Sequence, residues 1–122
     1  MLTRKIILST VLILICFVTI FAADPTGKWT TTINTQIGDQ AYTYDFKIEG
    51  EKLTGTAKSQ FGEVQLTDGT FKDDVLSFVE NVSFEGNAIR ISYKGKISGD
   101  EIKFSRQVGE FATEEFVAKR AK

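Results

Sequence analysis

The chain has 122 residues, of which 15 are Lys or Arg and 16 are Asp or Glu, and its formal net charge is −1. This slightly acidic balance argues against nucleic acid as a partner. Histidine is absent, and the single cysteine, Cys16, lies in an N-terminal segment that we expect to be cleaved. The mature chain would then lack the usual general base, the thiolate nucleophile and the common nitrogen and sulfur metal ligands. We therefore expect no metal, no cofactor and no catalytic residues, and we favour a non-catalytic protein over an enzyme.

Residues 1–23 have the organisation of a secretory signal peptide. Arg4 and Lys5 precede an apolar segment over 6–21, and two alanines follow it. We predict that this signal is cleaved, leaving a single domain over 24–122 that is secreted or periplasmic, monomeric and free of the membrane. A retained membrane anchor is the alternative, because the apolar segment approaches the roughly 18 residues that begin to span a bilayer. The predicted domain has no cysteine, so its core must stabilise it without disulfides.

Beyond the signal, bulky and polar residues alternate along the chain, which is typical of strands with one buried face. Glycine and acidic residues, as in 49–52, separate the alternating segments and indicate short turns. The pattern predicts about eight strands. The residues expected to share one face of each longer strand are, in chain order, Trp29, Thr31 and Ile33; Tyr42, Tyr44, Phe46 and Ile48; Leu76, Phe78, Val82 and Phe84; Ile89, Ile91, Tyr93 and Ile97; Ile102 and Phe104; Phe116 and Ala118. Shorter strands are expected over 53–57, 64–66 and 69–71.

Short connections between consecutive strands predict an all-β, antiparallel, up-and-down meander. Eight strands in an open sheet would leave two long unpaired edges, and closure into a small barrel removes them. A two-sheet sandwich is the alternative, but it normally needs at least one longer crossover than this spacing offers.

The sequence Gly27-Lys28-Trp29 opens the first strand. It resembles the Gly-x-Trp signature of the calycin barrels, which comprise the lipocalins and fatty-acid-binding proteins. The resemblance implies that the tryptophan closes one barrel end and that an arginine from a late strand lies against its ring. Arg106 and Arg120 both have the strand parity for this role, and we assign barrel closure to Trp29 and Arg120.

The whole region from residue 27 to 116 also resembles small, uncharacterised secreted bacterial modules. Such modules occur alone or beside glycoside hydrolases. This resemblance implies a saccharide context and an exported hydrolase as a partner.

Polar groups on the predicted inner face are candidates for binding a ligand. Tyrosines combine an apolar ring with a polar tip, and Glu80 shares the parity of Phe78. A bulge near residues 79–81 would instead turn Glu80 to solvent, and the aromatic residues could simply form the core. Small residues at 55, 57 and 95 would either leave room for a ligand or mark bends in a narrow barrel. The predicted ligand-binding residues are Tyr42, Tyr44, Phe78, Glu80, Tyr93 and Arg106.

These observations favour a secreted, non-catalytic module that binds a small apolar or saccharide ligand. The alternative is a protein-interaction or accessory module of an exported glycoside hydrolase, whose barrel is filled and whose function lies on its surface. The two hypotheses differ in whether the interior holds a cavity.

Overall fold

The computed structural model describes residues 24–121, so the predicted signal peptide at 1–23 lies outside the described residues. The described part is a series of nine strands. These are β1 (Gly27–Thr35), β2 (Gly38–Glu49), β3 (Lys52–Ser59), β4 (Gly62–Gln65), β5 (Thr67–Lys72), β6 (Val75–Phe84), β7 (Asn87–Ser98), β8 (Glu101–Val108) and β9 (Ala112–Arg120).

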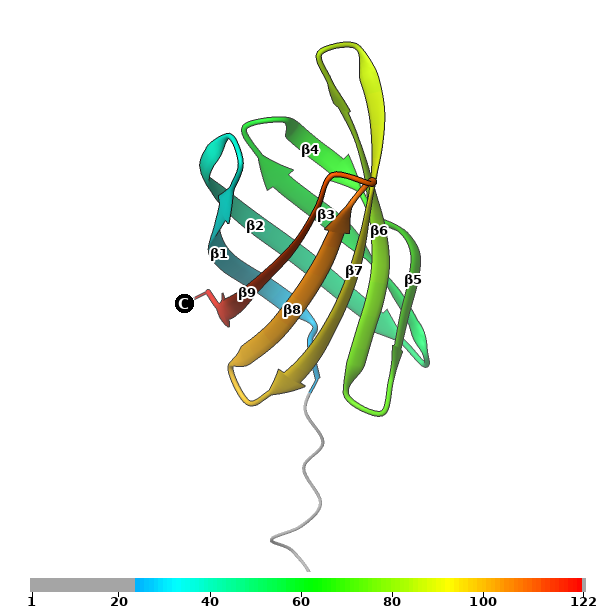
Figure 1. Cartoon of the computed structure of the whole chain (residues 1–122). Coiled ribbons are helices and arrows are strands. Elements are labelled where there is room, and N and C mark those ends of the chain that lie inside the picture. Colours follow the sequence, from blue (N-terminus) through cyan, green and yellow to red (C-terminus); the bar gives the residue numbers. More distant parts are fainter. Residues whose placement is uncertain (1–23, 122) are drawn as a thin grey trace, which may run out of the picture.

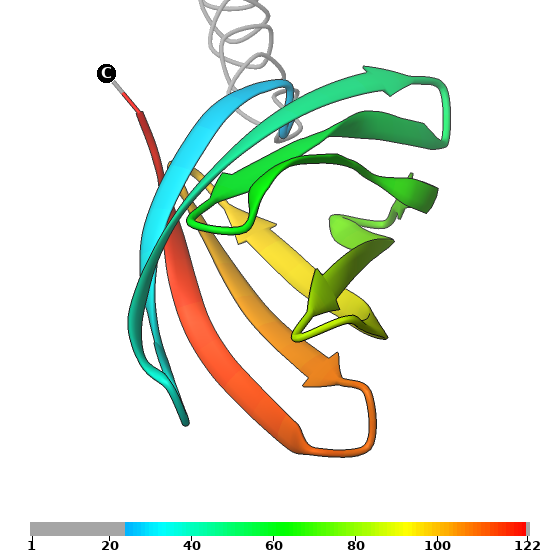
Figure 2. The same ribbon diagram turned by 90° about the horizontal axis from the view of Figure 1, so that it is seen from above.

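The strands form one antiparallel sheet that closes on itself, as Figures 1 and 2 show. Apart from β4 and β5, strands that are consecutive in the chain are paired, and β9 pairs with β1 to complete the ring. Both β4 and β5 pair with β3, so they act as one strand interrupted at Leu66. The predicted up-and-down barrel is confirmed, and the sandwich alternative is wrong because no strand leaves the ring for a second sheet within residues 24–121.

Alternation places the bulky residues inside the barrel, where they form one continuous core. The register between β6 and β7 is unbroken from Val75 to Phe84, with Phe78 opposite Tyr93. The irregularity lies in β5 instead, between Thr67 and Thr70. Because β6 has no bulge, Glu80 keeps the parity of Phe78 and lies fully buried inside. The alternative of an outward Glu80 is therefore wrong.

Two inward glycines allow close approach of neighbouring groups and leave no room for a ligand. Gly55 has φ +153°, and a Cβ atom there would lie 1.9 Å from the carbonyl oxygen of Asp45. A Cβ on Gly95 would lie 2.5 Å from the ring of Phe104. These glycines therefore permit the tight curvature and filling of a narrow barrel.

One end of the barrel is closed by the residues that precede β1. Trp29 is fully buried, and its indole N–H donates a 2.8 Å hydrogen bond to the Pro25 carbonyl. The Arg120 guanidinium lies 4.4 Å from the centre of the Trp29 ring. It also donates hydrogen bonds of 3.1 and 3.0 Å to the carbonyls of Thr26 and Asp24. Arg120 therefore holds the segment that precedes β1 next to the Trp29 indole. Arg106 lies elsewhere, and Arg120 is the arginine at this end.

Candidate functional site

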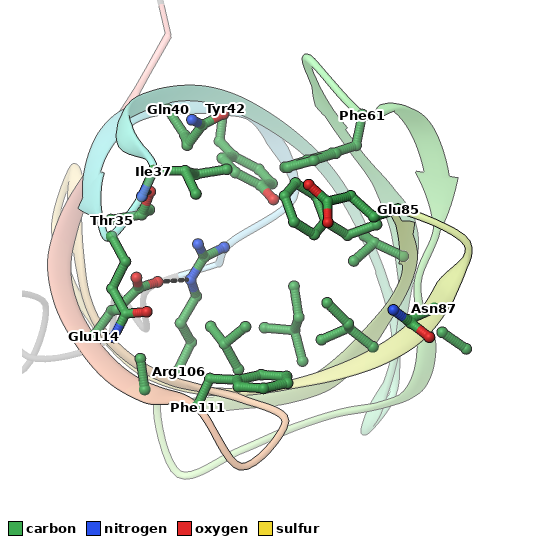
Figure 3. A pocket seen from close by; sticks show the side chains of 18 residues that line it. Thr35, Ile37, Gln40, Tyr42, Phe61, Glu85, Asn87, Arg106, Phe111 and Glu114 are labelled. Atoms are coloured by element: carbon green, nitrogen blue, oxygen red, sulfur yellow. Dashed lines mark hydrogen bonds and ion pairs between the residues drawn. The ribbon is translucent and has the colours of Figure 1, made fainter.

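A cavity of about 410 Å³ occupies the opposite end of the barrel (Figure 3). The β1–β2, β3–β4, β6–β7 and β8–β9 turns surround it, and the β6–β7 hairpin extends beyond the others (Figure 1). Aliphatic and phenyl groups dominate its walls, which include Ile37, Phe61, Val82, Phe84, Ile89 and Val108. One end of the barrel is thus closed, and the opposite end contains the cavity.

Arg106 and Glu114 place a buried ion pair on one side of this cavity. The two residues face each other across β8 and β9, and Arg106 Nε donates to Glu114 Oε1 at 2.7 Å. Their side chains are only 4% and 11% exposed. The guanidinium also lies 5.1 Å from the centre of the Tyr42 ring, and its end points into the cavity (Figure 3). A fixed charge pair therefore faces a mainly apolar space.

Beneath the ion pair, a hydrogen-bond network connects the cavity to Glu80. The Tyr93 hydroxyl accepts from Arg106 Nη1 at 2.8 Å and from the Tyr44 hydroxyl at 2.9 Å, and it donates to Glu80 Oε1 at 2.7 Å. The Tyr42 hydroxyl donates to Glu80 Oε2 over a longer 3.4 Å. Every buried side-chain nitrogen and oxygen in the described part of the chain has a partner. The network is therefore complete without a ligand, which makes it a rigid floor for the cavity.

Burial shifts the protonation equilibria of this network. It raises the pKa of the Glu80 carboxyl above 4.5, although the Tyr93 hydrogen bond, the Arg106 charge and the Tyr42 hydrogen bond act in the opposite direction. Burial also raises the pKa of the Tyr44 and Tyr93 hydroxyls well above 10. The phenols are thus neutral donors at physiological pH.

The predicted ligand-binding residues divide into two levels. Tyr42 and Arg106 line the cavity. Glu80, Tyr44, Phe78 and Tyr93 lie below them in the filled half of the barrel, where the Phe78 and Tyr93 rings stack at 4.5 Å between centroids. Only the first pair is therefore placed to touch a ligand, and the lower residues hold that pair in position.

Sequence reasoning missed Glu114 and the apolar residues of the mouth. Glu114 shares the strand parity of Phe116 and Ala118, which would have placed it inside β9. The mouth residues Ile37 and Phe111 belong to turns, where strand parity gives no orientation. Their side chains are 53% and 71% exposed, and both line the cavity.

Comparison with known proteins gives no family assignment. No protein-family model matches the chain, and no curated protein matches it. Among solved structures, it is similar to a secretary abundant heat soluble protein from Ramazzottius varieornatus. That match has 15% sequence identity and a TM-score of 0.43, and it covers 83% of this chain and 98% of the other. Membership of the calycins stays a resemblance, while the closed antiparallel barrel rests on the strand pairing itself.

Residues 24–121 contain no group of three or more His, Cys, Asp or Glu side chains that could hold a metal ion. They also contain no helix with the length and apolar character needed to cross a membrane.

We predict that Glu80 makes stability depend on pH. Because its pKa is higher in the folded than in the unfolded protein, its contribution is fully present below about 4.5 and is lost as pH rises through the folded pKa. The free energy of unfolding, measured with urea and the fluorescence of Trp29, should therefore fall over this range. Glu80→Gln should show a flatter curve there, and equal slopes for the two proteins would contradict the assignment.

Proposed function

We propose that the protein is a non-catalytic binding protein that holds a small molecule in the open end of its barrel. The observation that carries this proposal is the cavity of about 410 Å³, which lies above a fully hydrogen-bonded floor. Concave, largely apolar sites with a few convergent polar groups are the usual sites for small ligands. We also propose that the protein acts outside the cytoplasm, as the sequence of residues 1–23 predicts.

The lining supports an amphipathic ligand with an apolar body more strongly than a saccharide. Side chains such as Val82, Ile89 and Val108 offer contacts to hydrocarbon but no partners for a row of hydroxyl groups. The single tryptophan, a flat surface on which a sugar ring could stack, is Trp29 at the opposite end. The polar lining residues also include Thr35, Gln36, Gln40, Glu85 and Asn87, but the buried charges of the lining are those of Arg106 and Glu114.

The exposed apolar residues of the mouth support the same proposal. Ile37 and Phe111 lie on different turns, and both line the cavity. An apolar ligand in the cavity would cover both side chains, which explains why large apolar residues are exposed here. Association with an exported glycoside hydrolase stays a prediction of the sequence resemblance.

Filling the cavity should abolish binding of a neutral apolar probe. Val82 is buried and lines the cavity, whereas Val117 lies on the outer face of β9. N-phenyl-1-naphthylamine should fluoresce more strongly with the wild type and with Val117→Trp, because both retain the cavity. Val82→Trp should lose about tenfold or more in probe affinity, since the indole would occupy the site.

The two tryptophan variants carry the same substitution, so they serve as a matched pair. Circular dichroism should confirm that both are folded before the titration. Equal probe affinity for the two variants, or no binding by the wild type, would contradict the proposal.

A further inference from the structure

We propose that the cavity selects ligands whose polar group is uncharged and rejects carboxylates, with Glu114 as the residue that sets this preference. The inference deepens the proposed function and rests on it. It follows from the balance of charge around the cavity and from the way in which the Arg106 guanidinium is already engaged.

Charges on the cavity lining favour the exclusion of anions. Arg106 is the single basic lining residue, and Glu85 and Glu114 are acidic. Glu80 lies directly below, hydrogen-bonded to Tyr93. Even with Glu80 neutral, the lining carries one more acidic than basic group. A ligand carboxylate would therefore enter a site of its own charge sign, where like charges cost several kcal/mol at close range.

The guanidinium already uses two of its five N–H groups, and one of them is the Nε–H that takes part in side-on binding of a carboxylate. Arginine binds carboxylates best through two parallel N–H groups. Here Nε donates to Glu114 at 2.7 Å and Nη1 donates to Tyr93 at 2.8 Å. A ligand carboxylate would have to share the cation with Glu114, whose negative charge already balances it. The Glu114 carboxylate thus already takes the place beside Arg106 that a ligand carboxylate would need.

An uncharged group that both donates and accepts hydrogen bonds fits this side of the cavity. A hydroxyl or amide could accept from the end of the guanidinium and donate to the carboxylate of Glu114. Neither bond requires the Arg106–Glu114 pair to break, so the buried charges stay compensated. The ligand class is therefore an apolar molecule with a hydroxyl or amide at one end.

Displacement of N-phenyl-1-naphthylamine by chain-matched competitors tests the inference. We expect 1-decanol to displace the probe from the wild type at least about tenfold more effectively than decanoate at about pH 8, where decanoate is ionised. Glu114→Gln removes the competing charge, so it should reduce or reverse this ratio. Glu115→Gln is the matched control, because Glu115 is exposed on the outer face of the same strand, and it should leave the ratio unchanged.

The outcomes separate this inference from the proposed function. Failure of the wild type to bind the probe would overturn both. Probe binding with decanoate equal to or stronger than 1-decanol would overturn the selectivity alone, and this comparison needs no variant. An unchanged ratio in folded Glu114→Gln would overturn the role of Glu114, whereas a ratio that falls in this variant and not in Glu115→Gln would support it.

Discussion

Replacing Arg106 by methionine is expected to lower the free energy of unfolding by about 3–5 kcal/mol at neutral pH. The guanidinium is only 4% exposed and compensates a carboxylate that is 11% exposed. Without it, the Glu114 carboxylate loses its 2.7 Å partner and Tyr93 loses a donor. The pKa of Glu80, already raised by burial, should rise further because a nearby positive charge is gone. The cost should therefore be smaller in acid.

Urea unfolding followed by the fluorescence of Trp29, the single tryptophan, measures this loss. Arg90→Met is the control, because Arg90 is exposed on the outer face of β7, and it should change the free energy of unfolding by less than about 0.5 kcal/mol. A loss below about 1 kcal/mol for Arg106→Met would mean that the buried network does not depend on its cation.

Replacing Trp29 by alanine should have an effect of similar size, with a loss of about 3–5 kcal/mol. The indole is fully buried and fills the closed end, so its removal leaves a large void. The substitution also removes the hydrogen bond to Pro25 and the ring beneath the Arg120 guanidinium. The segment that closes the barrel would then lose two of its attachments at once.

Thermal or urea unfolding by circular dichroism suits this variant, which has no tryptophan. Phe111→Ala is the control, because it deletes another large aromatic side chain, 71% exposed, from the open end. It should alter stability by less than about 0.5 kcal/mol. Comparable losses for the two variants would contradict the assignment of one structural and one open end.

The fold could be predicted from sequence because one physical rule extends through the whole domain. Alternating residues such as Tyr42, Tyr44 and Phe46 on β2 must share a face, and short turns leave few ways to bury that face. The same rule placed Glu80 and Arg106 inside, since both share parity with buried neighbours. These positions follow from local periodicity, so they needed no knowledge of strand register.

The division of the interior into a filled and a hollow half could not be predicted this way. It depends on which side chains meet across the barrel, as in the 5.4 Å contact between the Phe46 and Phe78 rings. Such contacts join β2 to β6, which are not paired strands. Parity likewise cannot distinguish Tyr42 at the cavity from Tyr44 below it. Whether a residue reaches a ligand depends on its position along the barrel axis. That position is set by strand register and strand tilt.

The most direct test of the account is a titration of the isotopically labelled protein with 1-decanol, followed by the NMR signals of its side-chain methyl groups. We predict saturable shifts that gather at Ile37, Val82, Ile89 and Val108 of the cavity wall, with little change at Val117 on the outer face. Shifts confined to the outer face, or none up to the solubility limit of 1-decanol, would contradict a ligand site in the open end of the barrel.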